Sequence, residues 1–199
     1  EEAARHTRYE VLEKCADKLG CTAIATAHNS DDNAETILLN LTRGAGAKGL
    51  GGIPPMRGRL IRPLLATSRA QIEAYLAENG VAHISDSTND TDDYTRNVIR
   101  HRVMPVLRGI NPEFSASAMR TAELLREDEE FLDKLAAGFL SDHFENGSLP
   151  IPELAALPKP VAARVLRKIC GRSLTAGHTK ALFDIMQSKT LARTDIHGM

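Results

Sequence analysis

Apolar and polar positions in the first half of the chain follow a pattern that predicts helices separated by short strands. Residues 1–19, 34–43 and 68–80 carry apolar residues at helical spacing, and a glycine marks the end of the first and last segments. Residues 21–27 are an apolar, β-branched run of the kind that forms strands, and residues 59–64 are predicted to form a second short strand. The order helix, strand, helix, strand, helix predicts an α/β fold with a parallel sheet.

Two strands are too few for a stable parallel sheet, so the predicted sheet is incomplete. The missing strands would come from outside this chain or from a second copy of it. An exposed central strand favours pairing between chains, so a homodimer is one expectation. The chain also starts in the middle of a predicted helix and without an initiator methionine, which indicates a fragment.

The second half of the chain has the pattern of a helical domain. Asn111 and Pro112 form a cap and a proline start for a long helix that we expect to reach residue 144. Beyond that helix, prolines separate short helical segments. We therefore expect an α/β part at residues 1–110, followed by a mostly α-helical part at residues 111–199.

Composition narrows the class of protein. The formal net charge of −1 means that RNA would have to bind local basic patches rather than a basic domain. Aromatic residues make up 4% of the chain, which argues against base stacking on an aromatic platform. The three cysteines lack metal-site spacing and fit reduced thiols of a cytoplasmic protein. No apolar run of the sequence reaches membrane-spanning length, so we expect no membrane partner.

The strongest candidate site is the turn that follows the first predicted strand. His28, Asp31, Asp32 and Glu35 lie within eight residues there, at the edge where α/β proteins bind ligands. The spacing of the three carboxylates brings them together on one side of a helix. The alternative is helix capping, which is worth a few tenths to about 1 kcal/mol per acidic residue. Three like charges exceed what capping needs, so we favour a site with a positively charged partner.

Basic residues near this turn are candidates for phosphate or RNA binding. Arg43 and Lys48 lie in a glycine-rich segment, residues 43–52, that we expect to be a flexible loop able to approach an anion. Arg62 lies in the second predicted strand and fits surface charge equally well. His28 fits either a phosphate ligand or an ordinary loop histidine.

A second basic segment precedes the long helix. Arg96 and Arg100 share a helical face that suits the recognition of an anion. They could instead pair with the acidic residues between 86 and 93. Pro105 should end or kink this helix.

Several motifs resemble the tRNA(Ile)-lysidine synthetases of the PP-loop superfamily, also called N-type ATP pyrophosphatases. These motifs lie at residues 2–5, 8–9, 27–36, 41–46, 50–55, 61–65, 94–100, 120–125 and 164–167. They cover nearly the whole chain in the order of the family. The resemblance implies an adenine nucleotide α-hydrolase-like first part and a helical domain that binds substrate or tRNA.

The resemblance also implies a reaction. These enzymes use ATP and Mg²⁺ to adenylate the C2 carbonyl oxygen of the wobble cytidine of an isoleucine tRNA, and the side-chain amine of L-lysine then displaces AMP. On this basis Asp31 and Asp32 are expected to be catalytic, with Asp31 also supporting the Mg²⁺ ion. The residues expected to bind lysine are Asp32, Glu35 and Arg96. The residues expected to bind phosphate or tRNA are His28, Arg43, Lys48, Arg62 and Arg100.

One motif of the family does not occur in this sequence. It is the phosphate loop, Ser-Gly-Gly-x-Asp-Ser, which we expect to lie upstream of Glu1. The chain alone should then be inactive and carry the lysine and tRNA side of the site. Two alternatives remain: a non-catalytic helical module that binds tRNA or protein, and another PP-loop enzyme such as a tRNA thiolase. The absence of a Cys-x-x-Cys pair argues against the thiolase.

Overall fold

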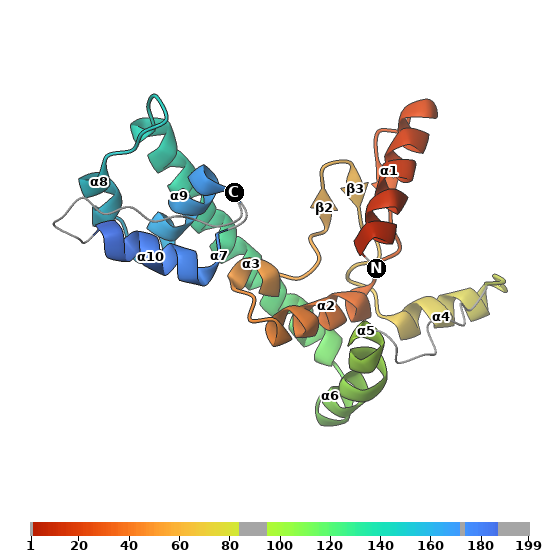
Figure 1. Ribbon diagram of the computed structural model, residues 1–199. Helices are drawn as coiled ribbons and strands as arrows, with labels where there is room; N and C mark the ends of the chain where they lie inside the picture. The colour runs from red at the N-terminus through yellow and green to blue at the C-terminus, as the bar shows by residue number, and fades with distance from the viewer. Residues whose placement is uncertain (1, 84–94, 172–173, 187–199) are drawn as a thin grey trace. The chain divides into compact units, whose positions relative to one another are not determined.

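The computed structural model describes residues 2–83, 95–171 and 174–186, and the chain divides into two compact units (Figure 1). The first unit is Glu1–Arg126 and the second is Glu127–Met199. The long helix α7, Phe114–His143, contributes residues to both. The functional division predicted between residues 110 and 111 stays a prediction.

The first unit contains a small mixed sheet, which confirms the α/β class. Strand β1 (Ile24–Ala25) pairs in parallel with β3 (Leu60–Ile61), and β2 (Met56–Arg57) pairs with β3 in antiparallel orientation. The sheet order is β1-β3-β2. The two predicted strands therefore pair in parallel as expected, and the sheet gains a third, antiparallel strand that the prediction did not include. The prediction missed β2, whose two exposed residues have no apolar pattern and which pairs through a tight turn at Gly58, where φ is 60°.

Helix α1 (Glu2–Lys18) covers the start of the sheet and ends before Gly20, where φ is 66°. Its buried Ala16 packs with Ile24 of β1 and Leu60 of β3. These contacts join the first predicted helix and both predicted strands in one apolar cluster.

Helix α2 (Ser30–Thr42) begins directly after β1 and carries the acidic turn. Asn29 caps it: its side-chain oxygen accepts from the N–H of Asp32, and the Asp32 carboxylate accepts from the N–H of Asn29. The reciprocal pair is a capping box. Ala34, at 0% exposure, anchors α2 in a cluster with Ile99 and Met104.

The glycine-rich segment after α2 is structured, so the prediction of a flexible loop was wrong. Residues Ala47–Leu50 form a short helix, α3. The fully buried Asn33 of α2 accepts the N–H of Ile53 at 2.6 Å and contacts the sulfur of Met119 at 3.2 Å. Gly52 has a φ of 66°, and a side chain there would collide with Asn33. The amide of Asn33 therefore fixes this segment, a non-local contact that composition does not reveal.

The segment that carries the second group of arginines is helical but irregular. Helix α5 (Thr95–Val98) continues into a π-helical turn, η2 (Ile99–Val103), and then into α6 (Met104–Ile110). The helix does not end at Pro105, one of the two outcomes predicted for this residue, but continues as α6 after a wide turn. Before it, helix α4 (Arg69–Glu78) starts with the capping box of Ser68 and Gln71.

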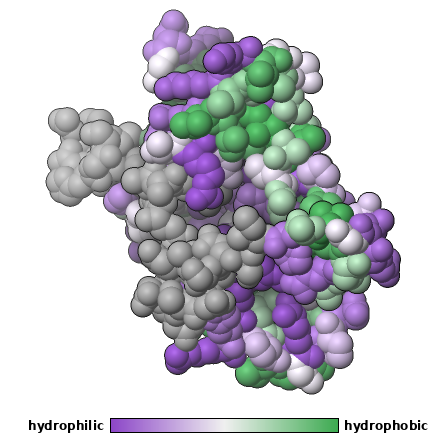
Figure 2. Space-filling view, turned by 90° about the vertical axis from the view of Figure 1, so that its right-hand side faces the viewer, coloured by the Kyte–Doolittle hydropathy of each residue, from purple (hydrophilic) through white to green (hydrophobic). Residues whose placement is uncertain are grey.

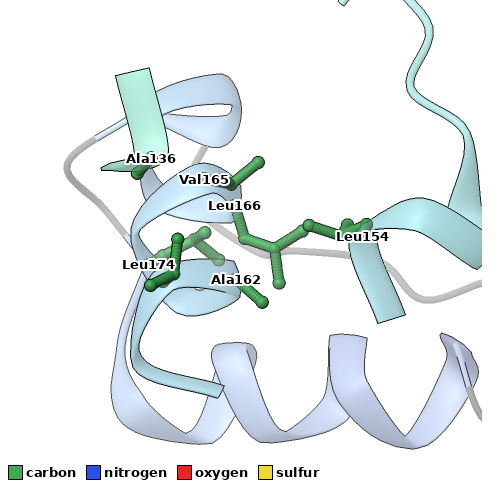
Figure 3. Packing of buried hydrophobic residues seen from close by; sticks show 7 residues of the cluster. Ala136, Leu154, Ala162, Val165, Leu166 and Leu174 are labelled. Carbon is green, nitrogen blue, oxygen red and sulfur yellow. The ribbon is translucent and has the colours of Figure 1, made fainter. Parts of the chain in front are cut away.

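The second unit is helical, as predicted for the end of the chain. It contains the end of α7, then α8 (Ile151–Ala156), α9 (Lys159–Cys170) and α10 (Ala176–Met186). Figure 3 shows its core side chains. The buried members of that core are Ala136, Leu154, Val161, Ala162, Val165, Leu166 and Leu174.

The surface of the molecule is mostly hydrophilic with separate hydrophobic patches on the face in Figure 2. Among the described residues, Val106 and Ile110 of α6 and Tyr75 of α4 are exposed apolar or aromatic side chains. No helix in the described part of the chain is both long and apolar enough to cross a membrane.

Candidate functional site

Glu35 is the centre of the acidic turn in the folded chain. It is 2% exposed and lies one turn into α2, facing α5 and η2. Its Oε2 accepts from Nε of Arg96 at 3.0 Å and from Nη2 of Arg100 at 2.9 Å, and its Oε1 accepts from Nε of Arg100 at 2.6 Å. Two guanidinium groups thus hold one buried carboxylate.

Asp32 shares both of these arginines but is held less tightly. Its Oδ1 lies 3.3 Å from Nη2 of Arg96 and 3.4 Å from Nη2 of Arg100, while its Oδ2 caps the helix through Asn29. Its side chain is 19% exposed, against 3% for that of Glu35. Asp32 therefore combines the capping role with an ionic contact that solvent can reach.

Asp31 has a separate set of partners. Its Oδ1 accepts from the Ser115 hydroxyl at 2.6 Å and from Nη2 of Arg108 at 2.8 Å, and its Oδ2 accepts from the N–H of Arg69 at 3.1 Å. Burial alone would raise the pKa of Asp31. The three donors outweigh burial and hold the pKa of this carboxyl below its ordinary value.

Three carboxylates thus face three arginines of the same chain, which balance the mutual repulsion of the acidic residues, and the site itself stays a prediction. The hydrogen bond from Arg100 to Glu35 is the main reason why the pKa of Arg100 is raised. The negative charges of Glu35, Asp32 and Asp31 raise this pKa further. The acidic residues between 86 and 93, which we considered as alternative partners of Arg96 and Arg100, lie outside the described residues.

Arg108 and Ser115 are site residues that sequence reasoning missed. Arg108 lies on α6, eight positions after Arg100, which is about 80° from Arg100 and about 120° from Arg96 around a regular α-helix. Ser115 is at the start of α7 and is 8% exposed. Neither residue carries a local sequence signal for its contact with Asp31, because both contacts depend on tertiary packing.

A partly open cavity of about 600 Å³ lies next to Asp31. Its lining includes Arg69 and Glu73 of α4, Arg108, and Glu113 and Ser115 near the start of α7. The volume is in the range of small-molecule sites. The carboxylate–arginine cluster consists of Asp31, Asp32, Glu35, Arg96, Arg100 and Arg108. Asp32 and Glu35 do not line the cavity, so the cavity adjoins this cluster on the Asp31 side only.

The donor set around Asp31 does not suit a Mg²⁺ ion. Both carboxylate oxygens already accept hydrogen bonds, and the guanidinium of Arg108 stands where a cation would bind. Within the described residues, no group of three or more His, Cys, Asp or Glu side chains could hold a metal ion. The geometry therefore gives no support to the expected metal role of Asp31.

The remaining predicted residues do not gather at this cluster. His28 follows β1, and its Nδ1 lies 2.9 Å from the Thr26 hydroxyl. Arg62 follows β3 and is 5% exposed, with Nη1 donating to the carbonyl of Pro54 at 2.6 Å. Arg43 is exposed at the C-terminal end of α2, about 12–18 Å from the three carboxylates by helix length, and Lys48 is exposed on α3.

Comparison with known proteins finds a family model that matches this chain. The family model described as the PP-loop domain matches residues 1–107. Because that match starts at the first residue, it does not support the expectation that the phosphate loop lies outside the chain.

Three relatives are each named tRNA(Ile)-lysidine synthase. The protein from Geobacillus kaustophilus is 42% identical over 175 residues, which cover 84% of this chain and 38% of the relative. The protein from Parabacteroides distasonis is 49% identical over 65% of this chain and 30% of its own length. The protein from Leifsonia xyli is 39% identical over 92% of this chain and 58% of its own length.

The chain spans less than two thirds of the length of each of these relatives. The family match covers more than half of the chain and contains α2, α5, η2 and thus Glu35 with both of its arginines. The chain belongs to the PP-loop domain family.

Proposed function

We propose that the protein to which this chain belongs forms lysidine, by ATP-dependent ligation of L-lysine to C2 of the wobble cytidine of an isoleucine tRNA. The observation that carries this proposal is the buried carboxylate–arginine cluster after β1, in a chain similar to proteins named tRNA(Ile)-lysidine synthase. The cluster can bind both the ammonium and the carboxylate groups of an amino acid, because it contains partners for each. This chain carries the lysine side of the site.

The proposed reaction has two steps. The C2 oxygen of cytidine attacks the α-phosphate of ATP and pyrophosphate leaves. The amine of lysine then attacks C2, the C2–O bond breaks, AMP leaves with the oxygen, and the amine loses a proton. The part of this chain is to bind and orient the amino acid, and ATP, supplied with Mg²⁺, activates the cytidine.

Lysine binding at this cluster requires an exchange of ion pairs. Asp32 is the first acceptor for a lysine ammonium group, because its contacts with the arginines are longer than those of Glu35 and its side chain is more exposed. Glu35 then keeps Arg100 in place through two hydrogen bonds. Arg96, at 28% exposure, can release Asp32 and turn toward the lysine carboxylate.

Asp31 contributes as a fixed negative charge. Its lowered pKa keeps it ionised at neutral pH, so it cannot donate a proton there. Through the Ser115 hydroxyl, the Arg108 guanidinium and the Arg69 N–H, it holds α7, α6 and α4 against the start of α2. We assign Asp31 to electrostatic support of Asp32.

The tRNA contacts come from the exposed basic residues. Arg43 and Lys48 are accessible to a phosphate backbone, and α3 presents Lys48 at the protein surface. His28, which follows β1, and Arg100, which is 20% exposed beside Glu35, are the less exposed candidates and would contact the activated nucleotide. Arg62 is too buried for an external polyanion, so a phosphate contact there would be with a small ligand at the carboxyl ends of β1 and β3. A protein that modifies tRNA in this way works in the cytoplasm.

Calorimetry with the full-length protein tests the proposal. The Asp32→Asn variant should bind L-lysine at least tenfold more weakly while its affinity for tRNA stays nearly unchanged, because the neutral amide can accept a hydrogen bond from the ammonium but forms no ion pair with it. The matched control is Glu78→Gln, an exposed carboxylate of α4. Unchanged lysine affinity in Asp32→Asn would assign Asp32 to capping and reject its binding role.

The same titration separates the proposal from a non-catalytic tRNA-binding module. Such a module would bind tRNA but not lysine in the unmodified full-length protein. The proposal requires both ligands to bind.

A further inference from the structure

The three arginines that face α2 are spaced unequally along the chain, at positions 96, 100 and 108. A regular α-helix turns about 100° per residue. Arg96 and Arg100 would then differ by about 40°, and Arg108 would lie about 80° beyond Arg100. A regular helix would therefore direct Arg108 away from the carboxylates.

The π-helical turn removes this mismatch. The N–H of Met104 donates to the carbonyl of Ile99, five residues back, so η2 accommodates one extra residue in the helix. With that residue absorbed, Arg108 lies within about 20° of both Arg96 and Arg100. All three guanidinium groups can then reach carboxylates of α2, as their ion pairs show.

The same turn places the core. Ile99 and Met104 are 4% and 1% exposed and belong to one cluster with Ala34. A spacing of five residues would separate them by about 140° in a regular helix, but by about 40° across the wide turn. The hydrophobic and the ionic contacts of this segment therefore require the same register.

Pro105 gives the turn a local cause. Proline has no N–H to donate, and its ring collides with the carbonyl four residues earlier in a regular helix, here that of His101. Widening the helix before Pro105 relieves this collision, because backbone hydrogen bonds in the π-helical turn Ile99–Val103 join residues five apart instead of four.

We propose that Pro105 enforces the π-helical turn as a register device that aligns Arg108 with Asp31 while Arg96 and Arg100 stay on Glu35. Pro105 and Arg108 are thus positioning residues of the site. Arg108 acts through Asp31, which adjoins the 600 Å³ cavity and the proposed lysine-binding Asp32. The register device does not depend on the proposed function, and only its effect on turnover rests on lysidine formation.

Three variants of the full-length protein test the register. Pro105→Ala permits a regular helix and should move Arg108 away from Asp31. Deleting Val103, a 38% exposed residue of η2, together with Pro105→Ala should restore the alignment, because it removes the extra residue. The matched control inserts one alanine after Val103 in the Pro105→Ala background, which should move Arg108 further and give no rescue.

The readout is the coupling between Asp31 and Arg108 in urea unfolding, measured with Asp31→Asn and Arg108→Gln singly and together. We expect a coupling of at least about threefold in the unfolding equilibrium constant in the natural sequence. It should be lost in Pro105→Ala and return when Val103 is also deleted.

Persistence of the coupling in Pro105→Ala would overturn the role of Pro105. Absence of the coupling from a folded deletion variant would overturn the proposed register. If Pro105→Ala alone fails to fold, the deletion variant decides, since it has a regular helix in the required register. In an assay of lysine ligation, kcat/KM for lysine should fall in Pro105→Ala and recover when Val103 is also deleted. If the natural protein does not ligate lysine at all, the proposed function is rejected. The unfolding result on the coupling between Asp31 and Arg108 still stands in that case.

Discussion

Individual carboxylates of the acidic turn differ in role although they are close in sequence. Glu35 is buried and bound by two arginines, Asp32 is partly exposed and also caps α2, and Asp31 joins three other helices. The sequence could place all three near one another, because i to i+3 and i to i+4 spacing follows from the helix alone. Their separate partners come from residues far along the chain and were not predictable from that spacing.

The lowered pKa of Asp31 predicts how its contribution to stability depends on pH. A carboxyl whose pKa is lower in the folded than in the unfolded chain stabilises the fold above its unfolded pKa of about 4. That stability is lost as the pH falls through the folded value. We expect Asp31→Asn to unfold about 1–3 kcal/mol more easily at neutral pH, with the difference narrowing below about pH 4.

Urea unfolding of the two proteins over this pH range measures the effect. The exposed Asp128→Asn variant serves as control and should show little difference at any pH. A difference between Asp31→Asn and the natural sequence that stays constant with pH would contradict the paired state of Asp31.

At the scale of elements, local signals located most helices. Three helices could be located from residues inside them or beside them. The signals are the capping box at Ser68 for α4, the proline at the start of α9 and the apolar spacing of α1. Strand β2 escaped prediction because its own two exposed residues have no apolar pattern. Helix α3 escaped prediction because it is held by contacts from α2, such as the bond from the Asn40 amide to the carbonyl of Gly49. The π-helical turn escaped for a related reason: Pro105 predicts a disturbance but not its type.

Helix α8 gives a test of packing in the second unit. Leu154 is 2% exposed in the core of that unit, whereas Ile151 of the same helix is 49% exposed. Leu154→Ala should lower the free energy of unfolding by about 2–5 kcal/mol, through lost burial and the cavity left behind. Ile151→Ala should change it by less than about 1 kcal/mol. Chemical denaturation measures both, and equal losses would contradict the packing of α8.

At the scale of the whole molecule, each unit has its own hydrophobic clusters, and the proposed lysine site lies in the first unit. The family could be inferred from motifs spread along the chain, and the comparison with known proteins confirms it. The ion pairs of the site could not be inferred from the sequence, because the pairing of Arg108 with Asp31 depends on helical register and on the packing of α2 against α6.

The net charge of −1 means that the proposed tRNA binding depends on local basic residues. Replacing Lys48 by glutamine in the full-length protein should weaken tRNA binding and lower the slope of log affinity against log salt by about one unit. Lys14→Gln on α1 is the control, with an unchanged slope expected. Fluorescence titration at several salt concentrations measures the slopes, and equal slopes for Lys48→Gln and the natural protein would remove Lys48 from the tRNA surface.

The most direct test of the proposed lysine site is the transfer of labelled L-lysine to an isoleucine tRNA by the full-length protein. Incorporation should require ATP, and Asp32→Asn should lower kcat/KM for lysine at least tenfold, while Glu78→Gln leaves it unchanged. Lysine transfer at the natural rate by Asp32→Asn, or none by the natural protein with ATP and tRNA present, would contradict the assignment of the carboxylate–arginine cluster as the lysine site.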